Sequence, residues 1–528
     1  MAQQQNQQQE QEQPTIPLKI LFDKENNKVI AVEATQHFVD TLFSFLSLPL
    51  GTIIRLLRDQ NNPQQLIGNI NNLYQSVQNL TPNDVWNNVC KQMLLHPRNP
   101  CEALCSRLVL NVDDTEPSTG VFLVCDSCNK FTTFRNMDCT CGKPANKIPK
   151  NLDSEGNGNS NGDARGGVFV RENGSLFLVL DDLTVVPSSF VTSMELLLQL
   201  GYSDLTQLEV VTRNITKQEI LNLLKYTLIS HEPLTNTILG SGSKKKDNPA
   251  NQFASTVRAS PSTSIADNKM DVKLIQSKSQ KKIIFAEVNE DFVDFIFSFL
   301  TVPLGSIVKL LGGNTFVGCV DNLYKSVETL DSSWCTESRS VLLNPGVAPQ
   351  FSCPKQPLNI PNVETPPIYY YYGEGTFEDD YPFNTRRETI IEGGVISKSD
   401  RSIISVRRLT ALDPRSPKRL KESVVGFVKR PALYAVGDDL IVKSVSSGSC
   451  LVYLKELSLP LDDLEMKVIS IGEAEALSLL AASLTSKFTL TSGLKDFLDV
   501  PKQESSLTSK YTQTSRLDDL LKEPKPQA

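Results

Sequence analysis

Residues 38–57 read FVDTLFSFLSLPLGTIIRLL, and residues 292–311 read FVDFIFSFLTVPLGSIVKLL. Of the 20 aligned positions 13 are identical, and most of the others exchange Leu with Ile or Val, Ser with Thr, or Arg with Lys. Apolar residues recur at helical spacing in each copy until Pro49 or Pro303, where the helix must break because proline lacks a backbone N–H. The chain is therefore a tandem duplication, and a feature found in only one copy is a candidate for a specialised role.

The similarity continues on both sides of this signature. Residues 18–34 and 272–288 each place alternating apolar runs around a polar turn, which predicts a β-hairpin. Residues 71–80 and 321–330, NNLYQSVQNL and DNLYKSVETL, predict a further helix. The period through the signature is 254 residues, whereas solenoid repeats span ~20–50 residues. The sequence therefore predicts two duplicated globular units rather than an array.

Each copy closes with a second hairpin and further helices. Residues 167–186 place Asn173-Gly174 between alternating apolar runs, which is the strongest short-range signal for a hairpin turn. A helical pattern at 216–230 begins with Thr216 and Glu219, which form a capping box. This alternation of hairpins with helix groups predicts an α+β fold with two tandem homologous domains. Four cysteines between residues 125 and 141 add the prediction of a small zinc-ribbon-like hairpin in the first copy.

Shifts in composition predict the boundaries of these parts. The Gln-rich start and the polar end contain too little apolar surface to form a core, and a Gly-, Ser- and Lys-rich segment separates the copies. The predicted parts are a disordered tail at 1–16, a first repeat domain at 17–239 with its zinc-hairpin insert at about 120–145, a flexible linker at 240–270, a second repeat domain at 271–500 with a Tyr/acidic and basic insert at about 363–430, and a loose polar tail at 501–528.

Composition and charge exclude several classes of protein. The net charge of −7 argues against attraction of the whole protein to nucleic acid or to an anionic membrane. The first residues lack the basic and apolar regions of a signal peptide, and no apolar run reaches the ~18–20 residues of a membrane span. We therefore expect a cytoplasmic or nuclear protein without a membrane partner. In such a reducing compartment the 11 cysteines are thiols or metal ligands rather than disulfides.

A cluster of four cysteines occurs in the first copy alone. Residues 121–144, VFLVCDSCNKFTTFRNMDCTCGKP, contain Cys125, Cys128, Cys139 and Cys141. Two short cysteine turns at the ends of a hairpin can hold one Zn²⁺ in tetrahedral coordination, with sulfur at ~2.3 Å. Gly142 suits a turn that requires a positive φ. The spacing favours a structural zinc ion bound by these four thiolates.

Other interpretations of the cluster remain open. A redox dithiol would need a βαβ context that the sequence lacks, and ordinary unliganded thiols are a third possibility. A catalytic zinc is disfavoured because four thiolates leave no open position for water or substrate. Cys101 and Cys105 are alternative ligands, but Cys105 has a counterpart, Cys353, in the copy without a cluster, which favours a place in the core.

A basic stretch at 401–430 holds nine Lys and Arg residues against two acidic residues. It is a candidate for contacts with phosphate or for nuclear import, although a solvated loop is the favoured interpretation. Nearby, Tyr369 to Tyr372 and the acidic residues 378–380 form a segment that either folds back on the basic stretch or binds a partner. The cations of the candidate nucleic-acid surface are Arg407, Arg408, Arg415, Lys418, Arg419 and Lys421.

Few residues suggest catalysis, and we assign no catalytic or cofactor-binding residue. The three histidines, His37, His96 and His231, lack a local signature of a nucleophile–base pair, and no phosphate-binding loop is present. Asp181-Asp182 and Asp438-Asp439 recur near the second hairpins. Paired carboxylates can bind a cation, but Asp is a favoured turn residue, so solvated turns are the favoured interpretation.

These motifs together resemble the plant family catalogued as domain of unknown function 674. The resemblance rests on F-V-D-x-x-F-S-F-L-x-x-P-L-G, the NLY helix, the LLHP and LLNP turns, and the cysteine cluster, and it extends from about Pro17 to Val500. Tandem copies and a cysteine cluster after the first copy's helices are typical of that family, which supports the four cysteines as one unit. The resemblance implies a land-plant source, but it implies no activity, substrate or catalytic residue.

The sequence favours a non-enzymatic protein-interaction or scaffold module with a structural Zn²⁺, because no activated nucleophile or cofactor cradle is evident. We expect a protein partner, which the sequence does not identify. One alternative is a nucleic-acid-associated regulator that uses the 401–430 stretch. A second alternative is an enzyme with a cleft between the two repeats, since duplicated domains can build sites between them.

Overall fold

The structure is a computed structural model, and it describes most of the repeated sequence. The described residues are 14–58, 67–115, 123–151, 167–240, 269–363, 369–372, 375–379, 387–391, 395–397, 406–416, 425–445, 452, 455–456 and 460–498, apart from positions 126, 203, 354 and 431. The predicted tails at 1–16 and 501–528 and the linker at 240–270 lie almost wholly outside them, as does the acidic residue 380.

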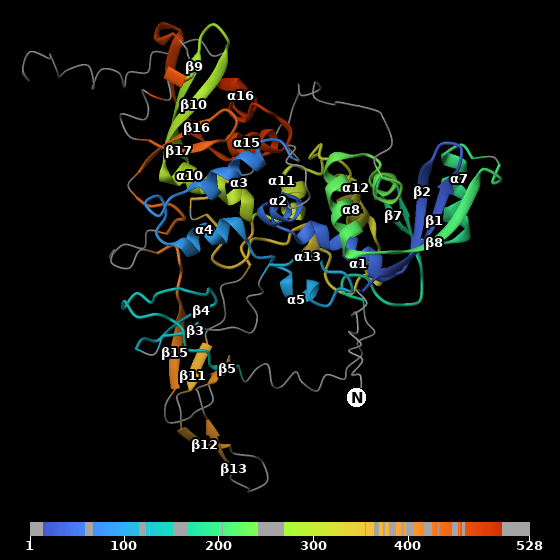
Figure 1. Cartoon of the computed structure of the whole chain (residues 1–528), viewed down its shortest axis with the longest axis horizontal. Helices are drawn as coiled ribbons and strands as arrows, with labels where there is room; N and C mark the ends of the chain where they lie inside the picture. Colours follow the sequence, from blue (N-terminus) through green and yellow to red (C-terminus); the bar gives the residue numbers. More distant parts are fainter. Residues whose placement is uncertain are drawn as a thin grey trace, which may run out of the picture.

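Each half of the chain builds one five-stranded antiparallel sheet from its own two hairpins and a fifth strand (Figure 1). The hairpins predicted at 18–34 and 272–288 are confirmed. The first sheet has the order β7-β6-β2-β1-β8, with β1 (Ile16–Asp23), β2 (Lys28–Ala34), β6 (Phe177–Leu180), β7 (Val185–Pro187) and β8 (Leu208–Ile215). The second has the order β17-β16-β10-β9-β18, with β9 (Met270–Ser277), β10 (Lys282–Asn289), β16 (Leu433–Gly437), β17 (Val442–Ser444) and β18 (Leu464–Ile471).

The turn of the second hairpin in the first half is not the predicted one. Strand β6 begins three residues after Gly174, and the chain reverses at Asp181-Asp182-Leu183 instead. Asn173 and Gly174 do form a turn, with φ of 75° at the glycine. The strand expected before it is absent from this hairpin because residues 168–170 bind elsewhere, to an aspartate and to the other half of the chain.

Helices from both halves fill the space between the two sheets (Figure 1). The helix breaks predicted at Pro49 and Pro303 are confirmed, as is the capping box of Thr216 and Glu219. No helix of the described residues is long and apolar enough to cross a membrane. The first half contributes α1 (Gln36–Ser44), α2 (Leu50–Arg58), α3 (Ile70–Asn79), α4 (Asn88–Leu95), α5 (Glu102–Cys105), α8 (Lys217–Ile229) and α9 (Pro233–Ile238). It also forms α7 (Phe190–Gln199), which lies at the outer end of the first sheet and buries none of its residues (Figure 1). The second contributes α10 (Glu290–Ser298), α11 (Leu304–Leu310), α12 (Val320–Thr329), α13 (Ser340–Leu343), α15 (Glu473–Thr485) and α16 (Thr489–Gly493).

The two P-L-G segments meet at the centre of the molecule. Leu50 N–H donates to the carbonyl of Val302 at 3.2 Å, and Leu304 N–H donates to the carbonyl of Leu48 at 3.0 Å. Glycine is required beside this junction because a Cβ on Gly305 would collide with the backbone oxygen of Leu342 on α13. The signature therefore specifies both the end of a helix and a close approach between the two halves.

Each half also sends a helix to the sheet of the other half. The amide of Asn72 on α3 donates to the carbonyl of Asp439 in the second sheet, and that of Asn322 on α12 donates to the carbonyl of Asp182 in the first. These contacts are equivalent under the internal repeat, since both asparagines precede Leu-Tyr. The buried side chains of both halves accordingly form one continuous cluster.

The aspartate of the first F-V-D motif anchors the segment that returns to the first sheet. The buried carboxylate of Asp40 accepts the backbone N–H groups of Val168, Phe169 and Val170 at 2.7–2.8 Å. Burial raises the pKa of Asp40, and these three N–H groups oppose that shift. Val170 then forms a bridge with Cys335 of the second half. One carboxylate thus positions a segment at the contact between the halves.

The second half repeats this arrangement and adds an arginine. Asp294 accepts the N–H groups of Phe427 and Val428 and binds Arg430, and Val428 bridges to Val85 of the first half. Burial raises the pKa of Asp294 to about 6 despite these favourable partners. Phe427 and Val428 are fully buried, so the solvated-loop interpretation of 401–430 is wrong for this end of the stretch.

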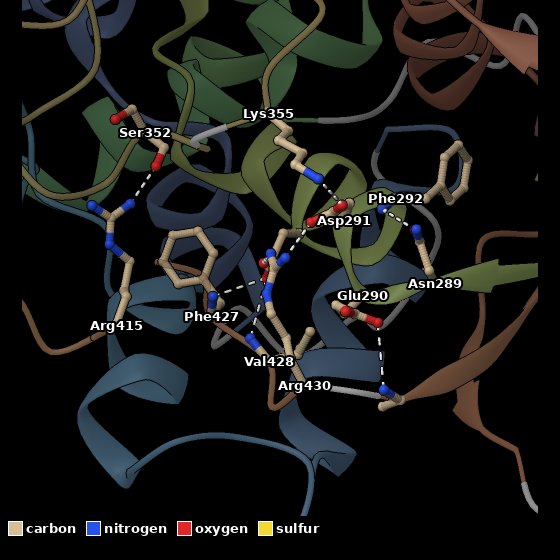
Figure 2. A network of polar contacts seen from close by, with 12 residues as sticks. Asn289, Glu290, Asp291, Phe292, Ser352, Lys355, Arg415, Phe427, Val428 and Arg430 are labelled. Atoms are coloured by element: carbon tan, nitrogen blue, oxygen red, sulfur yellow. Dashed lines mark hydrogen bonds and ion pairs between the residues drawn. The ribbon is translucent and has the colours of Figure 1, made fainter. Parts of the chain in front are cut away.

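Arg430 joins two acidic residues of α10. Its guanidinium binds both Asp294 and Asp291, and Lys355 binds Asp291 from the other side at 2.6 Å (Figure 2). Burial opposes ionisation of Asp291, but hydrogen bonds from Lys355 and Arg430 outweigh it, so its pKa is lowered. The basic residue at position 430 therefore stabilises the core instead of serving as a free surface charge.

The anchoring aspartates generate the first prediction. Replacing Asp40 with alanine leaves three buried N–H groups without an acceptor, which we expect to cost about 2–5 kcal/mol of unfolding free energy. Asp294→Ala should be at least as harmful, because it also removes a partner of Arg430. Urea unfolding followed by tryptophan fluorescence measures both, and Asp204→Ala, on an exposed turn, is the control. Unchanged midpoints for Asp40→Ala and Asp294→Ala would contradict this anchoring role.

Candidate metal centre

Inserts from both halves combine into one six-stranded sheet beside the main body (Figure 1). Its order is β3-β4-β15-β11-β14-β5, in which β4 pairs with β15 and β5 with β14 in parallel. The first half supplies β3 (Leu123–Val124), β4 (Lys130–Thr132) and β5 (Lys150–Asn151), and the second supplies β11 (Tyr369–Tyr372), β14 (Val395–Ser397) and β15 (Val406–Ala411). A separate ladder pairs β12 (Gly375–Asp379) with β13 (Arg387–Ile391). The inserts of the two copies, which differ in sequence, therefore combine into one sheet, called here the joint sheet.

Aromatic residues of the second insert form the small core of this sheet. Tyr369 and Tyr371 are buried with Val124, Phe131 and Leu409, and the rings of Phe131 and Tyr369 meet edge to face at 5.2 Å. Strand β11 pairs along its length with β15. Of the two roles expected for the tyrosine run, the structure therefore supports folding back on the basic stretch.

The joint sheet is fastened to the main body beside the cysteines. The guanidinium of Arg98 lies 4.2 Å from the centre of the Phe134 ring and donates to the hydroxyl and the carbonyl of Thr133, both at 2.7 Å. Phe134 also packs against Phe351 of the second half at 6.0 Å. The cysteine hairpin is therefore held by residues of both halves.

The structure brings the four predicted cysteines together. Their Sγ atoms all lie within 4.8 Å of one another, and Cys125 and Cys141 are 3.6 Å apart. Four sulfur atoms at ~2.3 Å from one tetrahedral ion would lie about 3.8 Å apart, so the cluster fits such an ion with small shifts. Gly142 has φ of 88°, as predicted, and its N–H donates to the carbonyl of Cys139. Cys125, Cys128, Cys139 and Cys141 therefore form a possible metal site.

An apolar shell surrounds the inner side of the cluster. Cys125 and Cys139 are buried together with Met137, Ala145 and Leu412, whereas Cys141 faces solvent. Leu412 comes from the second half, and its N–H donates to the carbonyl of Phe131 on β4 at 2.7 Å. The environment of the cluster therefore depends on both inserts.

The thiols differ strongly in acidity. The backbone N–H of Lys143 lowers the pKa of Cys141 to about 7. The neighbouring Cys141, followed by desolvation, raises the pKa of Cys128 to about 12, and burial raises the pKa of Cys125. One thiolate is thus available at neutral pH, whereas Cys125 and Cys128 need a compensating positive charge to ionise. A divalent cation supplies that charge.

The alternative ligands Cys101 and Cys105 lie in the main core. Both are buried, and Cys105 Sγ lies 3.6 Å from the hydroxyl of Ser47. Burial raises the pKa of Cys105 to about 11 and that of Cys101 to about 12. The counterpart Cys353 is buried as well, so the core placement predicted for Cys105 is confirmed.

The recurring aspartates cap the closing helices. Asp181 accepts the N–H and hydroxyl of Thr235 at 2.9 and 2.7 Å, and Asp438 accepts those of Thr491 at 2.8 and 2.7 Å. Both carboxylates lie in turns, as predicted, but they are buried rather than solvated. Because threonine donors occupy their oxygens, the geometry gives no support to a cation site there.

The basic surface proposed for nucleic acid receives little support. Arg415 is buried, binds Asp413 and donates to the carbonyl of Ser352 (Figure 2). Arg408 is exposed on β15. The side chain of Arg407, together with Lys418, Arg419 and Lys421, lies outside the described residues. The observations therefore favour no particular phosphate contact.

One small cavity lies where described residues of the two halves meet. This cavity, lined by both halves, including Phe43, Val170 and Leu342, has a volume of only about 10 Å³. That volume holds about one water molecule. It therefore offers no supporting observation for an enzyme with a substrate cleft at this position.

The acidity of Cys141 gives a prediction for the metal-free protein. At pH 7 we expect iodoacetamide to modify Cys141 roughly ten times faster than the half-buried Cys335, because the thiolate is the nucleophile. Peptide mass spectrometry over a time course measures both rates in one sample. Added Zn²⁺ should protect Cys141 and leave Cys335 unchanged. Equal rates for the two thiols in the metal-free protein would contradict the prediction.

Comparisons with known proteins agree with these features of the chain. No curated protein and no solved structure matches it. A family model described as "Protein of unknown function (DUF674)" matches residues 12–474, which include both copies of the signature and the four-cysteine cluster. Because this match extends over most of the 528 residues, the chain belongs to the DUF674 family.

Proposed function

We propose that this protein is a non-enzymatic protein-interaction or scaffold module with a structural zinc ion bound by Cys125, Cys128, Cys139 and Cys141. One observation carries the proposal, namely that the cluster lies where the inserts of the two halves meet. Leu412 of the second half belongs to the same buried apolar cluster as Cys125 and Cys139, and β4 pairs with β15. A metal ion at this point would hold the joint insert together.

The donor set favours a structural role for the ion. Four thiolates complete a tetrahedral shell and leave no position for water or substrate. The strands beside the cluster are short, with two residues in β3 and three in β4, so their own ladder contributes little stability. Coordination would supply the missing stability, as in zinc-ribbon-like hairpins, because folding and metal binding are coupled.

We also propose that the two repeats form separate but interlocked domains. Residues 17–239 and 271–500 would be two homologous domains joined by the linker at 240–270, with exchanged helices and a shared insert. Such an arrangement presents the joint sheet at a distance from the central core, as a platform for a protein partner. The cytoplasm or the nucleus is the location that we propose for this protein.

The first test is the metal content of the purified protein. Mass spectrometry should find one zinc ion per chain, and Cys125→Ser and Cys139→Ser should each lose it. Cys335→Ser is the matched control, because this cysteine lies in the second half and outside the cluster. The absence of zinc from the wild-type protein and all three variants, or equal zinc in all of them, would exclude the site.

The second test asks whether the metal organises the second insert. Removing zinc by a chelator should increase hydrogen exchange in residues 406–412, although these residues belong to the other half of the chain. The strands β9 and β10 of the second sheet should keep their protection and serve as the internal control. Loss of protection in β3 and β4 alone would limit the ion's role to its own hairpin.

A further inference from the structure

The first sheet ends in a long exposed edge. Strand β8 has eight residues, and among the described residues it pairs with β1 on one side only. Val210 and Val211 in its middle are exposed, Val210 by 64%. A long edge strand with apolar side chains and free backbone groups is a template for pairing with another strand. No local pattern in the sequence predicts this strand.

The corresponding edge of the second sheet carries a device against such pairing. Strand β18 is also eight residues long and lies at the end of its sheet. Val211 of β8 pairs with Ile20 of β1. Leu274 of β9 is the residue equivalent to Ile20, and it pairs with Lys467 of β18. Lys467 is therefore the counterpart of Val211. Lys467 is half-buried, and its ammonium group donates to the carbonyl of Phe497. A charge held in the middle of an edge strand opposes strand addition. The β8 edge, with valine at this position, lacks that protection.

We propose that the β8 edge is a dimer interface at which a second copy of this chain adds its own β8 in antiparallel orientation. The register places Val211 opposite Val211 of the second copy. Glu209 then lies opposite Arg213 of the second copy, and the symmetric pair forms on the other side of the axis. An interface of this kind is self-complementary, as a twofold dimer requires.

Charges already present beside β8 extend this complementarity. Glu209 binds Lys24, and Arg213 binds Glu219 within the same chain. In the dimer these side chains form rows in which positive and negative groups alternate from one copy to the other. Opposite charges across paired strands stabilise a register, whereas a shift by one residue would place Glu209 away from Arg213.

Helix α7 lies beside the same sheet (Figure 1), and its exposed side chains add apolar surface there. The helix follows β7 at one edge of the sheet and precedes β8 at the other, and none of its residues is buried. Leu198, Leu200 and Leu205, at its C-terminal end and in the loop that leads to β8, are exposed. A second copy bound along β8 would lie beside these side chains. The β8 edge is separate from the metal centre, which belongs to a different sheet.

The oligomeric state of the full chain tests this inference. Sedimentation velocity at about 50 µM should give a species of twice the 58.5 kDa chain mass. Val211→Lys, which copies Lys467, and Val211→Glu should each sediment as monomers, because like charges would face each other across the axis. An equimolar mixture of the two variants should recover the dimer, since lysine then faces glutamate. Circular dichroism verifies that both variants are folded.

A matched variant on the other edge supplies the control. Val468→Lys on β18 is also at an exposed position and should leave the dimer intact. A wild-type monomer at this concentration, or a dimer that survives Val211→Lys, would overturn the inference. A dimer lost in Val468→Lys but not in Val211→Lys would place the interface on β18 instead. Monomers in the mixture of the two charged variants would overturn the register centred on Val211.

Discussion

The arrangement of the two halves depends on a buried aspartate in each F-V-D motif. Asp40 and Asp294 lie inside the apolar signature helices, where a carboxylate is costly unless hydrogen bonds satisfy it. The required donors are backbone N–H groups of segments more than 120 residues further along the chain. Each segment can satisfy the carboxylate only where the returning chain also meets the other half. The cost of burying the charge thereby makes this one arrangement more favourable than its alternatives.

The exchange of contacts between the copies follows from the same geometry. The P-L-G segments bring the two backbones together at the centre, and Asn72 and Asn322 each reach a turn of the opposite sheet. Those turns contain Leu183 and Leu440 at positive φ, a conformation that is unfavourable for leucine. Contacts from the other half hold each strained turn in place. Each sheet is built from one copy, but its strained turn is held by the other copy.

Local patterns in the sequence predicted the parts of the fold that local forces determine. The first hairpins, the helix breaks at Pro49 and Pro303, the capping box and the four clustered cysteines all rest on contacts between residues close in sequence. The sequence did not predict the exchange of helices or the joint insert sheet, because both depend on pairing over long separations. The prediction of a hairpin turn at Asn173-Gly174 was wrong for the same reason, because Asp40 binds the segment that would have formed its first strand.

Duplication explains why the copies diverged where they did. The shared helices are constrained by contacts that occur twice, so a change in one copy disturbs both halves of the common core. The inserts and outer edges are free of that constraint, and there the copies differ. The first insert contains the four cysteines, and the second contributes Leu412 to the buried cluster around them. On the outer edges, Val211 of β8 occupies the position that Lys467 occupies in β18. Surfaces for a metal ion and for a second copy would then arise in positions where divergence costs the core little. The most informative residues for function are therefore those at which equivalent positions of the two halves disagree.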